Sequence, residues 1–187
     1  LGRKLSITGK GRCNLTSHLP IEDFIKNIPG NGKFLFSAFS QFTNEDLLQY
    51  FHSLGVETKV ERGERVFPVS DDAMQIVNTL KHELERYQVK ILVNHKVEEI
   101  LVENNDVKAV KTQAGQIPCD KVILATGGKS YPMTGSDGYG YEIASKLGHT
   151  IVEPKGSLIP MEICEKLDLQ GLALKNVSIH VWDNQKL

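Results

Sequence analysis

The spacing of hydrophobic residues predicts two or three helices between residues 19 and 55 and one more after residue 70. Between residues 19 and 55 the apolar side chains recur every three or four positions, in one stripe over 21–28 and another over 47–54. Asn44, followed by Glu45 and Asp46, suits the start of the second helix. The longest stripe, over 73–87, predicts the clearest helix, with Ser70 as its N-cap.

Runs rich in branched apolar residues predict strands between these helices and after them. They fall at residues 4–8, 56–70, 89–93, 96–102, 107–112 and 117–124. The last three predict a small antiparallel meander. Within the final run, residues 121–125 are apolar without alternation, which predicts a strand covered on both faces inside a parallel sheet.

The remainder of the chain predicts one more helix and the start of a second domain. A helix is expected to start at Ser136 and to end at Gly148. From residue 158 the pattern becomes β-like, and Val177, Ile179 and Val181 alternate with polar residues. We therefore expect a first domain over residues 1–155 and the beginning of a β-rich domain over 156–187.

Composition and charge favour an ordinary globular, cytoplasmic protein. The chain has 187 residues, 40% hydrophobic and 24% charged, and a formal net charge of −1. This balance argues against a nucleic-acid or membrane partner. No stretch reaches the roughly 20 apolar residues of a membrane span, and residues 1–13 lack a signal-peptide core.

The cysteines and histidines do not predict a metal or disulfide site. Cys13, Cys119 and Cys164 lie far apart with no C-x-x-C pair, which also argues against a thiol–disulfide flavoenzyme. The 6 histidines show no H-x-x-x-H spacing, so no metal is expected. No catalytic acid or base stands out in the sequence.

The first candidate for binding chemistry is the glycine turn at residues 9–14. It has the first two glycines of G-x-G-x-x-G but Asn14 in place of the third. Arg12 offers paired donors that suit a phosphate. The alternative is an ordinary turn with solvated charges. Cys13 is either a reactive thiol activated by Arg12 or, more commonly for such a residue, a buried inert one.

The second candidate is the end of the apolar run, Thr126-Gly127-Gly128. Ligands of open α/β sheets bind outside the carboxyl ends of strands, and glycines let the backbone approach them closely. The alternative is a tight turn from strand to loop. A meander followed by this strand is the order found in the FAD domains of flavoproteins with two dinucleotide-binding folds.

Three long segments carry a specific resemblance. GRKLSITGKGRCNLTS, ERVFPVSDDAM and ILATGGKSYPMTGSDGYGYEIASKLGHTI resemble the hallmark segments of the BaiN/YhiN-type family of bacterial NAD(P)/FAD-dependent flavoproteins, in the family's order. The resemblance implies a three-layer α/β, Rossmann-like FAD-binding domain. It also implies that this domain is partial, lacking its first strand, glycine loop and helix.

The resemblance also implies cofactors and their contacts. It places Lys4 and the turn containing Gly9, Gly11, Arg12, Cys13 and Asn14 near the pyrophosphate and flavin of FAD. Val97 would meet the adenine, and Thr126, Gly127 and Gly128 would line the pyrophosphate. We therefore expect the early glycine turn and the 126–128 strand end to converge on one cleft.

The implied function is hydride transfer from NAD(P)H through FAD to an organic acceptor such as an enone or another conjugated ring compound. The alternatives are a module with this fold and no catalysis, and a fragment unable to bind cofactor. Tyr131 and Tyr139 are further candidates as donors to the flavin. The sequence departs from the common family pattern at Ser17 and in TGSDGYGY, where Asp137 and Tyr139 stand and the acidic residue has moved.

Overall fold

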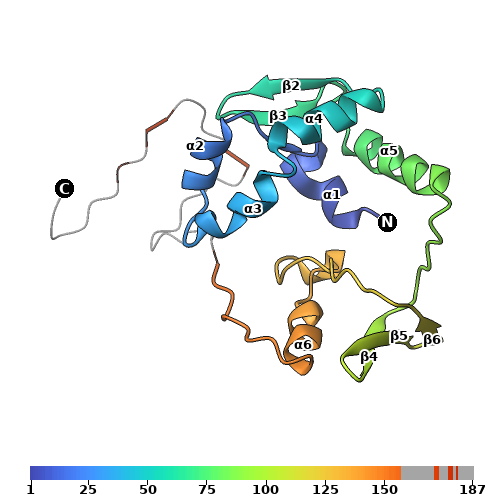
Figure 1. The fold of residues 1–187 in the computed structure, drawn as a ribbon. Helices are drawn as coiled ribbons and strands as arrows, with labels where there is room; N and C mark the ends of the chain where they lie inside the picture. The colour runs from blue at the N-terminus through green and yellow to red at the C-terminus, as the bar shows by residue number, and fades with distance from the viewer. Residues whose placement is uncertain (157–170, 173–176, 179, 181–187) are drawn as a thin grey trace, which may run out of the picture. The chain divides into compact units, whose positions relative to one another are not determined.

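The computed structural model describes residues 1–156, 171–172, 177–178 and 180 (Figure 1). Contacts divide the chain into a first unit, Leu1–Val152, and a second, Glu153–Leu187. The predicted β-rich domain at 156–187 falls largely outside the described residues, so that domain stays a prediction.

The chain begins with a helical turn where a strand was predicted. Residues 4–8 fall in α1 (Arg3–Ile7) and the short 3-10 helix η1 (Thr8–Gly11). The Ser6 N–H donates to the Gly2 carbonyl at 2.8 Å, and the Ser6 hydroxyl donates to the Arg3 carbonyl at 2.8 Å. The strand prediction was wrong because a run of five residues is too short for its apolar period to separate helix from strand.

The predicted helices between residues 19 and 87 are confirmed, with a short 3-10 helix among them. They are α2 (Ile21–Lys26), η2 (Gly32–Leu35), α3 (Phe36–Phe39), α4 (Asn44–Ser53) and α5 (Ala73–Arg86).

The caps of the two long helices are not the predicted residues. Thr43 caps α4 in a reciprocal capping box with Asp46. Asp72 caps α5, because its side chain accepts from the Met74 N–H at 2.8 Å, whereas the Ser70 hydroxyl bonds to Gln75.

A three-stranded antiparallel sheet lies beside α4 and α5 in Figure 1. It contains β1 (Thr16–Ser17), β2 (Thr58–Glu61) and β3 (Arg65–Pro68) in the order β1-β3-β2. The buried residues Cys13, Phe51, Val56, Ala73 and Ile76 form a hydrophobic core, against which Leu5 of α1 packs. This core fixes the position of α1 and therefore of the residues at its start.

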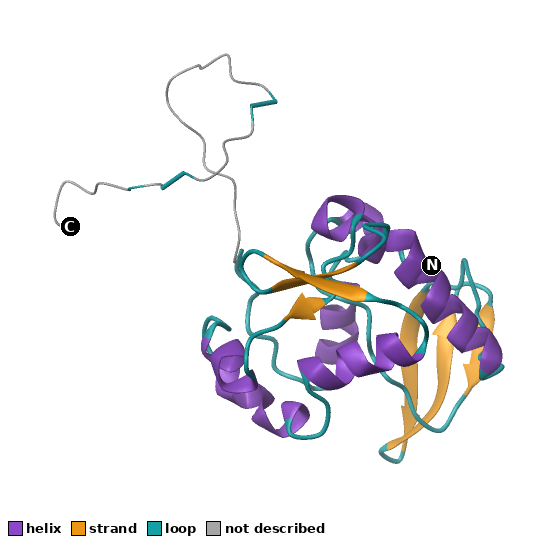
Figure 2. Cartoon of the chain, turned by 90° about the horizontal axis from the view of Figure 1, so that it is seen from above, coloured by secondary structure: helices purple, strands orange, loops and turns teal. Residues whose placement is uncertain are grey.

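The predicted meander is confirmed, although its third strand spans residues 115–118 and not the predicted 117–124 (Figure 2). Strands β4 (Val97–Glu103), β5 (Asp106–Thr112) and β6 (Gly115–Pro118) pair antiparallel in the order β4-β5-β6. The predicted strand at 89–93 is absent: these residues form a loop after α5. Val89 is 48% exposed and Val93 61% exposed, so apolar type alone did not create a strand there.

The run at residues 121–125 is not a strand in this structure. Ile123 is 92% exposed, and both sheets formed by the described residues are antiparallel. A parallel strand is stable only between neighbours that satisfy its backbone and cover its two faces. None of the described elements takes that place. The mixed α/β class therefore holds, and the three-layer parallel arrangement stays a prediction.

The last described helix packs on the meander. The 3-10 helix η3 (Pro132–Thr134) leads into α6 (Tyr139–Lys146), which ends as predicted before Gly148. It begins three residues later than the predicted start at Ser136, after Gly138, whose left-handed conformation forms the N-cap. The Tyr139 hydroxyl donates to the Glu98 carbonyl at 3.0 Å, which joins α6 to β4.

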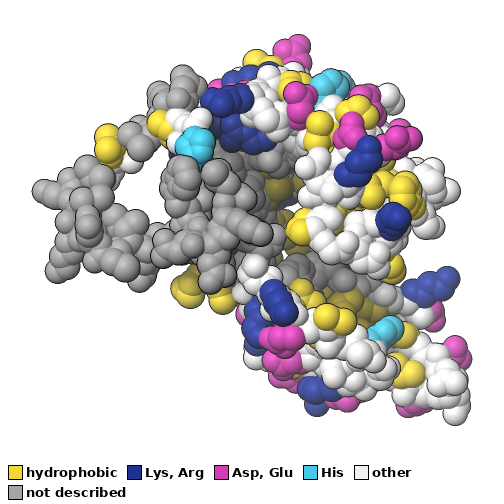
Figure 3. Space-filling model, turned by 90° about the vertical axis from the view of Figure 1, so that its left-hand side faces the viewer, with side chains coloured by type: hydrophobic (Ala, Val, Ile, Leu, Met, Phe, Trp, Pro, Cys, Tyr) yellow, Lys and Arg dark blue, Asp and Glu magenta, His cyan; other side chains and the backbone are white. Residues whose placement is uncertain are grey.

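The described residues on the face shown in Figure 3 form neither a purely basic nor a purely acidic surface. Basic and acidic side chains are interspersed on the face shown in Figure 3. Among the described residues, no helix combines the length and apolar character that a bilayer crossing requires.

Candidate functional site

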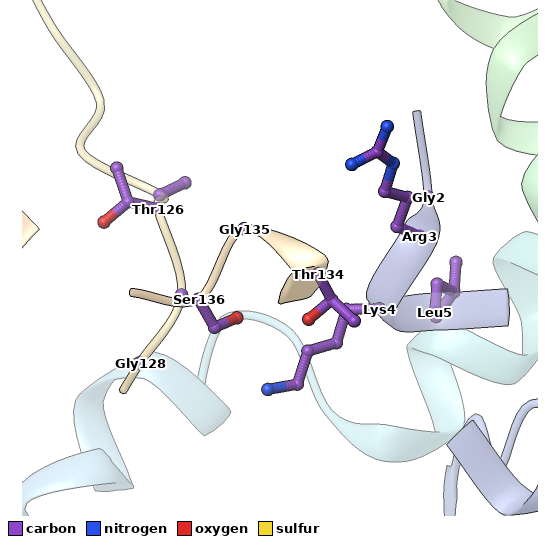
Figure 4. A pocket seen from close by; sticks show the side chains of 11 residues that line it. Gly2, Arg3, Lys4, Leu5, Thr126, Gly128, Thr134, Gly135 and Ser136 are labelled. Atoms are coloured by element: carbon purple, nitrogen blue, oxygen red, sulfur yellow. The ribbon is translucent and has the colours of Figure 1, made fainter. Parts of the chain in front are cut away.

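Two segments more than a hundred residues apart form one cleft of about 410 Å³ (Figure 4). The start of α1 supplies one wall, and the loop before α6 supplies the other. The lining residues are Gly2, Arg3, Lys4, Leu5, Ala125, Thr126, Gly127, Gly128, Thr134, Gly135 and Ser136. We call this the α1–loop cleft.

Lys4 ties the two walls together. Its Nζ donates to the Ser130 carbonyl at 2.6 Å and to the Ser130 hydroxyl at 2.8 Å. It also lies 5.4 Å from the centre of the Tyr131 ring. An ammonium group has three N–H donors, so one remains for a ligand in the cleft.

Arg3 adds a second positive charge. In Figure 4 its side chain extends away from that of Lys4, at the other end of the cleft wall. Within the described part of the chain it forms no side-chain hydrogen bond or ion pair.

The opposite wall is built from glycines and hydroxyls in close contact. Gly127 has a φ of 77°, and a Cβ atom there would lie 3.1 Å from the Ser136 Oγ. Ser136 itself is 5% exposed. A larger residue at 127 would therefore need both an unfavourable backbone conformation and a displaced Ser136.

The chemistry of the cleft suits an anion. Two cationic side chains face a glycine-rich wall that carries the hydroxyls of Thr126, Thr134 and Ser136. Ammonium, guanidinium and hydroxyl donors are the groups that bind phosphate oxygens. The volume lies within the roughly 300–1,000 Å³ of small-molecule pockets.

The predicted convergence of the early glycine turn with the 126–128 strand end is wrong, although Lys4, Thr126, Gly127 and Gly128 do line one cleft. The cleft does not extend to the turn at residues 9–14, none of which lines it. Arg12 instead donates to Glu61 at 2.8 Å and to Asp71 at 3.3 Å, and its guanidinium lies 4.0 Å from the centre of the Phe67 ring.

The Glu61 hydrogen bond is the main cause that raises the pKa of Arg12 above its usual value. Two carboxylates beside this guanidinium disfavour an approaching phosphate. The donors that suggested a phosphate contact are used within the protein.

The other polar groups of this turn also bond within the protein. The Asn14 amide, in the orientation that suits its neighbours, donates to the Thr16 and Val66 carbonyls at 3.1 and 3.2 Å. Gly9 packs on Phe67, and Gly11 has open space beside it. Cys13 is fully buried, and this burial raises the pKa of its thiol. Between the two interpretations of Cys13, the geometry favours the inert thiol.

Val97 and the two candidate tyrosines lie outside the lining of the cleft. Val97 begins β4 and pairs with Thr112. Tyr131, 69% exposed with a φ of 55°, is held beside Lys4. The Asp137 carboxylate accepts from the Tyr139 N–H at 3.0 Å and lies 4.0 Å from the Lys96 ammonium, which gives the displaced acidic residue a structural role.

Several cleft residues were not among those predicted from the sequence. Arg3, Thr134, Gly135 and Ser136 line it. The basic pair Arg3-Lys4 and the Thr-Gly-Ser run after the 126–128 glycines were the available signals. No group of three or more potential metal ligands occurs in the part of the chain that the structure describes.

A mixed α/β chain whose glycine-rich loop faces basic residues has the features of nucleotide-binding domains. Residues 1–185 match the family described as "HI0933-like protein Rossmann domain". The chain therefore belongs to this family of Rossmann domains, and the predicted resemblance is confirmed.

Three relatives show how far the similarity extends. The chain is 33% identical over 171 residues to a 3-dehydro-bile acid delta(4,6)-reductase of Clostridium scindens, covering 87% of this chain and 39% of that protein. It is 32% identical over 184 residues to a ribosomal RNA dihydrouridine synthase of Haemophilus influenzae, covering 97% and 45%. The corresponding Escherichia coli protein is 30% identical over 179 residues, covering 92% and 42%.

These matches bear on the predicted partners. The chain spans less than half the length of each of these relatives. Two of them are named for ribosomal RNA, which counts against the expectation of no nucleic-acid partner. That expectation rested on net charge alone and stays a prediction.

Proposed function

We propose that this chain is part of an FAD-dependent oxidoreductase that transfers hydride from NAD(P)H to an organic acceptor. The observation that carries the proposal is the α1–loop cleft in a member of a Rossmann-domain family. FAD, when bound, would accept hydride from the nicotinamide and deliver it to the acceptor. The three-layer parallel sheet predicted for this domain is part of the same proposal.

The residues of the cleft fit the diphosphate of a dinucleotide. Lys4 would donate its remaining N–H to a phosphate oxygen while Ser130 holds its ammonium in place. Gly127 and Gly128 would let the loop backbone approach the same group. Arg3, exposed at the cleft wall, would neutralise part of the diphosphate charge.

The names of the relatives support a class of acceptor. A bile acid delta(4,6)-reductase and a dihydrouridine synthase both add hydrogen across a carbon–carbon double bond of a ring system. We extend this class, a conjugated ring alkene, to the present protein. Both a free small molecule and a base within RNA meet this description.

The test is spectroscopic. The full-length gene product is purified and its visible absorbance recorded before and after anaerobic addition of NADH or NADPH. We expect flavin bands that bleach with one of the two nucleotides and return on addition of a conjugated ring alkene. A full-length protein that stays colourless with added FAD would refute the proposal, and one that binds FAD but never bleaches would support the non-catalytic alternative.

A further inference from the structure

A second cavity, of about 370 Å³, lies in the helical segment between β1 and α4. It shares no residue with the α1–loop cleft. The lining residues are Glu22, Ile25, Lys26, Ile28, Gly30, Gly32, Lys33 and Phe36. We call this cavity the α2–α3 pocket.

The floor and one wall of the pocket are apolar. Ile25 is 5% exposed, whereas the Phe36 ring, which lines the pocket, is 51% exposed. Phe34, at 78%, and Phe42, at 51%, are further exposed aromatic side chains in the same segment. Only the Phe36 ring lines the pocket, so it is the aromatic surface offered to a molecule there.

Specific contacts hold the pocket in shape. Gly32 is buried against α2 so closely that a Cβ atom there would lie 2.5 Å from the Ile25 carbonyl oxygen. The Phe24 and Phe39 rings meet edge to face at 5.3 Å and join α2 to α3. The pocket is therefore a built feature of the packing between these helices.

The charges of the pocket indicate one feature of its ligand. Lys26 is paired with Asp23 at 2.8 Å and also interacts with Glu22, an acidic residue of the pocket lining, so its charge is offset. Lys33 has no ion pair or side-chain hydrogen bond within the described residues. An apolar floor beside an uncompensated ammonium group complements a molecule with apolar rings and one acidic group.

We propose that the α2–α3 pocket binds an apolar ring compound that carries one acidic group. The rings contact Phe36 and Ile28, and the acidic group lies against Lys33. This binding needs no flavin and does not depend on the function proposed above.

Two fluorescent probes that differ only in charge separate the two contacts. 1-Anilinonaphthalene-8-sulfonate carries an acidic group, and N-phenyl-1-naphthylamine has the same rings without it. Both are titrated into the full chain and into three variants whose circular dichroism spectra match the parent. The variants are Lys33→Gln, Phe36→Ala and Phe34→Ala, the last as a control because Phe34 does not line the pocket.

We expect Lys33→Gln to lower the affinity for the sulfonate probe about two- to fivefold, the usual effect of losing one exposed charge pair. The affinity for the neutral probe should stay unchanged. Phe36→Ala should weaken both probes, and Phe34→Ala neither. If Phe36→Ala and the parent bind the two probes with equal affinity, the proposal that the α2–α3 pocket is a binding site is wrong. If the Lys33→Gln variant binds both probes with the affinity of the parent, the inference that the ligand carries an acidic group is wrong.

Discussion

At the scale of single residues, Gly9 shows how a binding motif in the sequence can be a packing feature. Its φ is 57°, and a Cβ atom there would lie 2.8 Å from the Phe67 ring and 2.9 Å from the Asn14 nitrogen. Gly11, two residues further along the chain, has a φ of 83°, and a Cβ atom added there would have no atom beyond its immediate chain neighbours within 4 Å. The two glycines share the backbone conformation and differ in their surroundings.

We predict that Gly9→Ala lowers the free energy of unfolding more than Gly11→Ala does. The difference should be about 1–3 kcal/mol, the usual cost of overpacking a site with little room. Urea denaturation of both variants measures it. Equal losses would show that the contact with Phe67 and Asn14 relaxes without cost.

Asp71 makes stability depend on pH. The pKa of its carboxyl is held below the ordinary 3.8, first by the hydrogen bond from Lys59 and then by Arg12. A carboxyl with a lowered pKa in the folded state stabilises the protein above its ordinary pKa. That contribution is lost as the pH falls below about 4 and the carboxyl takes up a proton.

We therefore expect Asp71→Asn to reduce stability at neutral pH and to flatten its decline in acid. The measurement is the free energy of unfolding from pH 6 down to about pH 2, the range that spans ordinary aspartate titration. Asp120→Asn, which changes an exposed carboxyl in a loop, serves as the control. A parallel decline for Asp71→Asn and the parent would show that the ion pairs with Asp71 contribute nothing.

At the scale of elements, the capping box of α4 decides where that helix begins. The Thr43 hydroxyl accepts from the Asp46 N–H at 3.1 Å, and the Thr43 N–H donates to the Asp46 carboxylate at 2.7 Å. Asn44 instead donates to the carbonyls of Ser17 and Leu19, which fixes α4 to the segment around β1.

Removing the cap should cost a defined amount of stability. We expect Thr43→Ala to lose about 0.5–2 kcal/mol, the usual range for an N-cap oxygen. Thr43→Ser retains that oxygen and should lose much less. Thermal and urea unfolding report both values, and a serine variant as unstable as the alanine one would assign the loss to the missing methyl group.

The elements also show which parts of the fold could be predicted from the sequence and which could not. Long periodic stripes predicted α4 and α5, because an apolar period sustained over about ten or more residues distinguishes a helix from a strand. The runs with turn signals between them predicted the β4–β5–β6 meander. The short α1 and the run at 121–125 were not assigned correctly. Their conformation depends on contacts distant in sequence, through Leu5 in the core and through the partners that a parallel strand needs.

The same distinction applies to the candidate site. Lys4 and the 126–128 strand end were predicted together and line one cleft. Arg12 was predicted beside them, but its orientation depends on Glu61 and Asp71, which lie 49 and 59 residues further along the chain. No local pattern in the sequence contains that information.

For the molecule as a whole, the proposed function requires that the α1–loop cleft holds the dinucleotide. Lys4 is the residue that joins its two walls and offers a donor to a phosphate. Lys10, in the adjacent η1 helix, is an exposed lysine that does not line the cleft. The two positions form a matched pair for testing which part of this region meets the cofactor.

The most direct measurement is the affinity of the full-length protein for FAD in the variants Lys4→Gln and Lys10→Gln. Loss of one charge-assisted hydrogen bond costs about 1.5–3 kcal/mol, so Lys4→Gln should bind FAD at least about tenfold more weakly than the parent. Lys10→Gln should bind like the parent. If the Lys4→Gln protein binds FAD as tightly as the parent, the α1–loop cleft is not the FAD site.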